Sequence, residues 1–101
     1  MIKVVPTNGA AGLQVGWNKV VVSFTKGFGA TADNISHKDL KRCASLKRGE
    51  KIDFAGVLGR VNFSKDGNLE FYFTVRGEKG WLARVKMEDF RRALFWSWWP
   101  F

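Results

Sequence analysis

Residues 51–86 decide the expected fold, and they read KIDFAGVLGRVNFSKDGNLEFYFTVRGEKGWLARVK. Two turn signals, at 64–67 and 76–80, divide this stretch into three apolar runs. The middle run alternates, with Leu69, Phe71, Phe73 and Val75 on one side and Glu70, Tyr72, Thr74 and Arg76 on the other. A period of two is typical of a half-buried strand. The stretch therefore predicts a three-stranded antiparallel meander.

The two outer runs have the same pattern. In the third run, Trp81, Ala83 and Val85 alternate with Leu82, Arg84 and Lys86. The first run changes phase near Gly56, as a bulge at a glycine would produce. One face of the meander is thus expected to be aromatic and buried. The other is expected to carry Arg60, Tyr72, Arg76, Arg84 and Lys86.

The chain before the meander has weaker signals. Residues 19–25 are β-branched and predict a strand, and residues 2–5 form a second short apolar piece. Gly and Ala predominate in 7–12, which we expect to be a mobile loop, and 26–34 also has the composition of a loop. Within it, Gly27-x-Gly29-x-x-Ala32 matches a dinucleotide fingerprint only formally, because no helix begins at these glycines.

Two helices are predicted. Ser36 and Asp39 form a short capping box, and Ile35 and Leu40 occupy the staple positions around it. This helix should run from His37 to Lys47, with Gly49 closing it in a left-handed cap. A second helix should begin near Met87 and stop before Pro100, with Arg91 and Arg92 exposed. Its buried stripe is Met87, Phe90 and Leu94, either with or without Trp98.

These elements predict one α+β domain spanning residues 1–101. A small antiparallel sheet, the meander plus one or two N-terminal strands, is accompanied by one helix before the meander and one C-terminal helix. Neither an internal repeat nor a linker is recognisable in the sequence. With 101 residues there is room for one core.

Charge is the strongest indication of function. The chain has 17 Lys and Arg against 9 Asp and Glu, a net charge of +8. A small globular domain this basic usually meets a polyanion, most often nucleic acid. The alternative is that the positive surface only keeps the protein soluble.

Catalysis and cofactors are not expected. His37 is the only histidine, Cys43 is the only cysteine, and the carboxylates are scattered among basic residues. We therefore expect no enzyme, metal site or cofactor. No apolar run approaches the ~20 residues of a membrane span, and a soluble, cytoplasmic protein is expected.

A binding surface for single-stranded nucleic acid needs cations for phosphates and aromatic faces for bases. Trp17 is either a stacking platform or a core anchor, and a single Trp at a strand start favours the core. The Lys and Arg side chains of the first predicted helix could equally form only its solvent-exposed face. The complete candidate set is Arg60, Tyr72, Arg76, Arg84, Lys86, Trp17, Lys41, Arg42, Lys47 and Arg48.

Two likenesses of architecture accompany this interpretation. The run from Leu46 to Gly56 looks like the beginning of an oligonucleotide-binding barrel strand. A curved sheet closed by a helix resembles the transcriptional-coactivator and Whirly type of single-strand binder, and this resemblance implies dimerisation through such elements. Neither likeness rests on a diagnostic motif.

The C-terminal segment 95–101 has more aromatic residues than one helix face can bury, namely Phe95, Trp96, Trp98, Trp99 and Phe101. Folding back on the sheet, pairing with a second subunit, or docking on a partner could each cover them. We predict a homodimer that binds single-stranded DNA or RNA with little sequence preference. The alternative is a small inhibitor or adaptor that docks on a larger protein through this aromatic tail.

Overall fold

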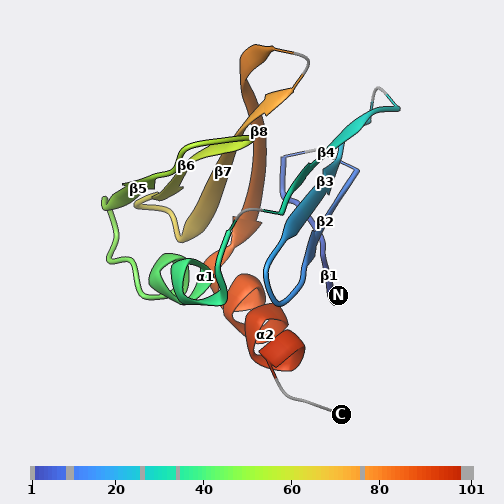
Figure 1. Cartoon of the computed structure of the whole chain (residues 1–101). Coiled ribbons are helices and arrows are strands. Elements are labelled where there is room, and N and C mark those ends of the chain that lie inside the picture. Colours follow the sequence, from blue (N-terminus) through green and yellow to red (C-terminus); the bar gives the residue numbers. More distant parts are fainter. Residues whose placement is uncertain (1, 9–10, 26, 34, 76, 99–101) are drawn as a thin grey trace.

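A computed structural model of the chain describes residues 2–8, 11–25, 27–33, 35–75 and 77–98, without the side chains of 78, 79 and 96–98. Two antiparallel four-stranded sheets and two helices make up the fold (Figure 1). The first sheet contains β1 (Ile2–Val4), β2 (Gly12–Val15), β3 (Val20–Ser23) and β4 (Gly29–Ala32). The second contains β5 (Lys51–Asp53), β6 (Leu58–Phe63), β7 (Asn68–Val75) and β8 (Glu78–Lys86).

Helix α1 (His37–Ala44) follows the first sheet and helix α2 (Met87–Trp98) follows the second. The order of four strands and a helix therefore occurs twice, although the sequences of the two halves show no repeat. In both sheets the strands are neighbours in chain order, and the helices lie together at one end of the pair of sheets (Figure 1).

The core lies between the inner faces of the two sheets and the helices. Strand β7 contributes Leu69, Phe71, Phe73 and Val75, which are all buried. The Phe71 ring lies 5.4 Å from the ring of Phe90 on α2, centroid to centroid, so the second sheet and its helix share one packed layer. From the first sheet come Val4, Leu13, Val15, Val20, Val22 and Ala32.

The mixed α+β class and the alternation of β7 are confirmed, but the one-sheet layout is wrong. Residues 51–63 are not one bulged strand: β5 and β6 form a hairpin whose turn includes Gly56 with φ of +123°. A turn and a bulge both shift the phase of the alternation, which is why the pattern did not distinguish them. The bulge itself lies at Gly59, between Leu58 and Arg60.

The N-terminal half holds two strands that the sequence did not predict. Strands β2 and β4 lie in or beside segments expected to be loops, because small residues such as those of Gly29–Ala32 have little intrinsic β propensity. Gly29 is required there for a close approach: a Cβ on it would lie 2.4 Å from the carbonyl oxygen of Val22 on β3. The N-terminal half therefore forms a separate four-stranded sheet, the first sheet, rather than adding one or two strands to the meander.

Helix α1 begins as predicted and ends earlier. Ser36 is its N-cap, and its hydroxyl accepts a hydrogen bond from the Asp39 backbone N–H at 3.1 Å. The helix stops at Ala44 rather than Lys47. Gly49, with φ of +90°, belongs to a separate turn in which the Glu50 N–H donates to the Lys47 carbonyl at 2.9 Å. Its left-handed conformation therefore serves this turn and not a helix cap.

Helix α2 matches the expected pattern. Met87, Phe90 and Leu94 are buried, and Arg91 and Arg92 are exposed. Neither α1 nor α2, as far as the described residues extend, is long and apolar enough to cross a membrane.

Candidate nucleic-acid interface

The outer face of the second sheet brings four of the predicted residues together. The strand register places Arg60 opposite Tyr72, Glu70 opposite Arg84, and Asn68 opposite Lys86. Because cross-strand partners point to the same side of a sheet, these side chains share one surface. Arg60 and Lys86 are exposed, whereas Tyr72 and Arg84 are partly buried. Arg76 lies outside the described residues.

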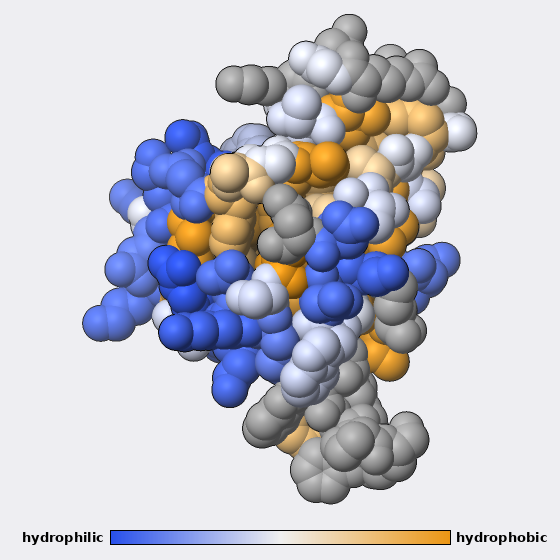
Figure 2. Space-filling model, in the orientation of Figure 1, coloured by the Kyte–Doolittle hydropathy of each residue, from blue (hydrophilic) through white to orange (hydrophobic). Residues whose placement is uncertain are grey.

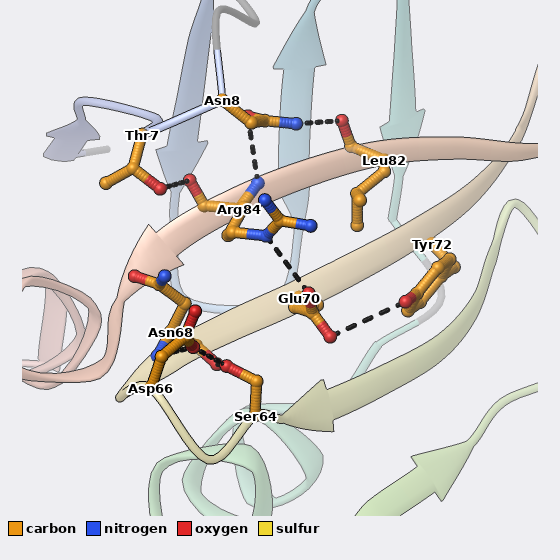
Figure 3. Close-up of polar contacts among 9 residues, drawn as sticks. All are labelled: Thr7, Asn8, Ser64, Asp66, Asn68, Glu70, Tyr72, Leu82 and Arg84. Carbon is orange, nitrogen blue, oxygen red and sulfur yellow. Dashed lines mark hydrogen bonds and ion pairs between the residues drawn. The ribbon is translucent and has the colours of Figure 1, made fainter.

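Carboxylates on this face engage both described arginines. The Arg60 Nε donates to Asp53 Oδ1 at 2.8 Å, and the Arg84 Nε donates to Glu70 Oε2 at 3.0 Å (Figure 3 for the second pair). The hydrogen bond from Arg60 lowers the pKa of the Asp53 carboxyl. The Arg60–Asp53 pair is exposed and stabilises little, so a phosphate can replace this carboxylate. The Arg84–Glu70 pair is partly buried. The two acids nevertheless reduce the positive charge of this face.

Tyr72 lies beside an open hollow of about 690 Å³. Its hydroxyl donates to Glu70 Oε1 at 3.5 Å (Figure 3). The hollow is lined by Asp53, Phe54, Gly56, Gly59, Arg60, Tyr72, Phe73, Thr74 and Gly80. An aromatic ring and a guanidinium beside an open hollow are groups that can contact a base and a phosphate, respectively.

The N-terminal segment closes the free edge of β8. The Thr7 N–H donates to the Arg84 carbonyl at 2.6 Å, and the Thr7 hydroxyl donates to the same carbonyl at 3.1 Å. The Asn8 side-chain amide donates to the Leu82 carbonyl at 2.9 Å, and its oxygen accepts from the Arg84 N–H at 3.2 Å (Figure 3 for the side-chain contacts). Thr7 and Asn8 lie outside the strands, between β1 and β2, as the predicted loop requires, and these hydrogen bonds tie them to β8. Asn8 was missed because its amide imitates a neighbouring strand, which no sequence period indicates.

Trp17 is the most informative aromatic residue. It lies in the β2–β3 hairpin, where the Gly16 N–H donates to the Lys19 carbonyl at 2.9 Å, and it is 52% exposed. The expectation that it anchors the core is therefore wrong. Its ring stacks on His37 with centroids 4.0 Å apart and 5° between the planes, and the His37 Nδ1–H donates to the Trp17 carbonyl at 3.2 Å. The imidazole thus supports an exposed indole.

The Trp17–His37 stack adjoins the basic surface of α1. His37 is the first residue of that helix, and Lys38, Lys41 and Arg42 are exposed on it. Together with Ser45 these side chains line a shallow hollow of about 380 Å³. Arg42 also pairs with Asp39 at 3.2 Å. Figure 2 shows a broad hydrophilic area over α1 and the connection to β5, where Lys47 and Arg48 are exposed as well.

The predicted C-terminal interface lies mostly outside the described residues. Phe95 is 52% exposed on α2, as an interface residue would be in an isolated chain. The side chains of Trp96 and Trp98 are not described, and neither are Trp99 and Phe101.

Three further observations concern metal, thiol and dinucleotide sites. No three His, Cys, Asp or Glu side chains there are grouped to hold a metal ion. Burial raises the pKa of the Cys43 thiol to about 12, which leaves the thiolate scarce. Gly29 and Ala32 lie in β4, antiparallel to β3, so the formal dinucleotide fingerprint lacks its helix.

Comparison with known proteins identifies no relative. No protein-family model matches the sequence, no curated protein matches it significantly, and no solved structure matches the fold significantly. The likeness to single-strand binders noted from the sequence therefore stays a prediction.

Proposed function

We propose that this protein binds single-stranded DNA or RNA with little sequence preference and acts as a dimer. The single observation that carries the proposal is the exposed indole of Trp17, stacked on His37 at the first turn of a basic helix. A base that stacks on the indole gains about 1–3 kcal/mol whatever its identity. The cations of α1 lie where the adjoining phosphates would run.

Charge supports the choice of ligand. The segment 36–50 holds five Lys and Arg against two acids, a net charge of +3 within the total of +8. Duplex DNA is less suited to the arrangement, because its bases are stacked on one another and cannot stack on Trp17. A cytoplasmic location fits a chain with a single buried cysteine and remains part of the proposal.

The dimer rests on the aromatic tail. Phe95 exposes about half of its surface, and four further aromatic residues follow it in the sequence. Burying one large apolar side chain stabilises by about 1.5–3 kcal/mol, so covering the exposed part of Phe95 favours association. A second subunit is its commonest cover in small proteins.

The second candidate function is docking on a larger protein through the same tail, and the exposure of Phe95 favours it equally. Salt distinguishes the two functions. Contacts with several phosphates weaken steeply as salt rises, whereas docking through Trp and Phe hardly changes.

An electrophoretic mobility shift with four labelled 20-mers, single- and double-stranded DNA and RNA, tests the proposal. We expect single strands to shift at lower protein concentration than duplexes of the same length. Equal affinity for mixed-sequence and homopolymer single strands is expected, because stacking and phosphate contacts do not identify bases. Preferential binding of the duplexes would contradict the proposal.

A further inference from the structure

A hollow of about 630 Å³ lies where the second sheet meets the beginning of α2 and the connection from α1 to β5. Three cations from three different elements line it: Arg48 from the α1–β5 connection, Lys86 from the end of β8, and Arg91 from α2. The other lining residues are Thr7, Phe63, Asp66, Gly67, Asn68, Met87 and Glu88. Arg48 and Lys86 belong to the candidate set from the sequence, whereas for Arg91 the sequence predicted only that its side chain would face water.

The two guanidinium groups are held in place by main-chain carbonyls. Arg48 Nη1 donates to the Lys65 carbonyl at 2.6 Å, and its guanidinium lies 5.8 Å from the centre of the Phe63 ring. Arg91 Nε donates to the Ala44 carbonyl at 2.8 Å. A guanidinium has five N–H donors, so each arginine keeps donors for a further acceptor. Both are therefore positioned before any ligand arrives.

The framework around these cations is itself fixed. Lys65 belongs to the β6–β7 turn, whose Gly67 carbonyl accepts a hydrogen bond from the Met87 N–H at 3.1 Å. The turn, the α1–β5 connection and the beginning of α2 are therefore tied to one another. None of the five ion pairs among the described residues involves Arg48, Lys86 or Arg91.

Two carboxylates also line the hollow, and they bear on its selectivity. Asp66 Oδ1 accepts hydrogen bonds from the Ser64 hydroxyl and, at 3.4 Å, from the Asn68 N–H, so one of its two oxygens is engaged within the turn. The Ser64 hydrogen bond lowers the pKa of Asp66, which remains ionised. Glu88 is exposed in the first turn of α2. The hollow thus has three cations against two anions, with one anion already bound locally.

The neighbours of the hollow indicate a chain of phosphates rather than a single one. Lys86 belongs also to the outer face of the second sheet, in the row beyond Arg84. Arg91 lines in addition a cleft of about 200 Å³ between the helices, together with Lys41 and His37. His37 in turn supports Trp17. The hollow therefore joins the sheet face to the basic surface of α1.

We propose that this hollow binds the phosphodiester backbone of a single strand and links Tyr72 on the sheet to Trp17 beside α1. Arginine forks match the paired oxygens of a phosphate, and Lys86 adds a third positive charge. The inference rests on the proposed function, since it assigns the path that the same ligand takes.

Single substitutions test the path. Lys86→Gln and Arg91→Gln each remove one charge from the hollow, and Lys3→Gln removes one from the outer face of the first sheet as a matched control. Each lost phosphate contact should make the plot of log binding constant against log salt concentration shallower by about 0.7. At 0.1 M salt this corresponds to roughly fivefold weaker binding of an oligo-thymidylate. Glu88→Gln should tighten binding. Melting curves check that each variant is folded. If Arg91→Gln does not fold, Lys86→Gln alone tests the path, because Lys86 is an exposed side chain without an ion pair.

The outcomes separate the path from the function. If the wild type binds oligonucleotides but Lys86→Gln and the folded Arg91→Gln bind them as Lys3→Gln does, the hollow does not bind the backbone, and the proposed function is unaffected. Displacement of the oligonucleotide by micromolar inorganic phosphate at constant ionic strength would overturn the assignment to a backbone. If the wild type binds no oligonucleotide, the function fails. Pyrophosphate titration followed on the Arg48 and Arg91 Nε–H signals then decides the hollow: shifts support an anion site, and their absence refutes it.

Discussion

Trp17→Ala removes the exposed indole and little else. The hydrogen bond from His37 goes to the main-chain carbonyl of Trp17, and the hairpin is closed by Gly16 and Lys19, so both survive the substitution. What is lost is the stack on His37, whose rings lie 4.0 Å apart. Such a pair stabilises by about 0.5–1.5 kcal/mol, which lowers the melting temperature by several degrees in a domain of this size.

The effect on binding should be larger than the effect on folding. One base stacked on the indole contributes about 1–3 kcal/mol, and its loss weakens binding about 5- to 150-fold. The salt slope should stay unchanged, because no phosphate contact is removed. Fluorescence anisotropy of a labelled oligo-thymidylate, measured at several salt concentrations, gives both quantities.

Trp17→Phe is the matched control, because it keeps an aromatic face at the same position and should retain part of the affinity. His37→Ala removes the support but not the indole, so a smaller loss is expected. Wild-type affinity in a folded Trp17→Ala variant would refute the assignment of Trp17 as a base platform.

Four further outcomes are expected. Ser36→Ala should lower the free energy of unfolding by about 1 kcal/mol through the lost N-cap, and an unchanged melting curve would contradict the cap. Cys43 should resist alkylation at pH 8 in the native protein and react once the protein is unfolded, because burial raises the pKa of its thiol from 9.0 to about 12. The same raised pKa means that the free energy of unfolding should fall as the pH rises above about 9, where the thiol ionises only in the unfolded chain. Arg84→Gln combined with Arg76→Gln should weaken binding at low salt and flatten the salt slope, and unaltered affinity would remove the sheet face from the site. Deleting residues 96–101 should give a folded monomer that binds short oligonucleotides more weakly; an intact protein that sediments as a monomer at tens of micromolar (about 10⁻⁵ M) would exclude the dimer.

The sequence was most informative where one period dominated. Strand β7 alternates without interruption, so both its type and its buried face followed from the residues. The capping box gave the beginning of α1, and the stripe of Met87, Phe90 and Leu94 gave the buried face of α2. In each case local chemistry and tertiary packing favour the same structure.

The first sheet could not be predicted in full, because its strands are short and contain small residues. Strand β4, with the sequence GATA, is stabilised by pairing with β3 and by the close approach at Gly29, and neither is visible in a local pattern. The alternation predicts a bulge at Gly56 where the structure has a hairpin turn, because a turn and a bulge both change its phase. The chain divides into two sheets because β4 and β5, the strands on either side of α1, are not paired with each other.

The candidate site was predicted in its residue types more than in its arrangement. The register of the second sheet brings Arg60, Tyr72 and Arg84 onto one face, as the alternation implied. The ion pairs of both arginines depend on the register between neighbouring strands. The stacking of Trp17 on His37 and the position of Arg91 depend on residues far apart in the chain. An aromatic residue in a hairpin flanked by Gly16 and Asn18 was the one local signal that could have indicated an exposed Trp17.

The central claim is that the protein binds single-stranded nucleic acid through phosphates and stacked bases. The dissociation constant of a labelled single-stranded 20-mer, measured by anisotropy between about 0.05 and 0.5 M salt, tests it most directly. Contacts with at least three phosphates predict a linear log–log dependence with a slope of about −2 or steeper. An affinity that does not change with salt, or no binding at the lowest salt with tens of micromolar protein (about 10⁻⁵ M), would contradict the account.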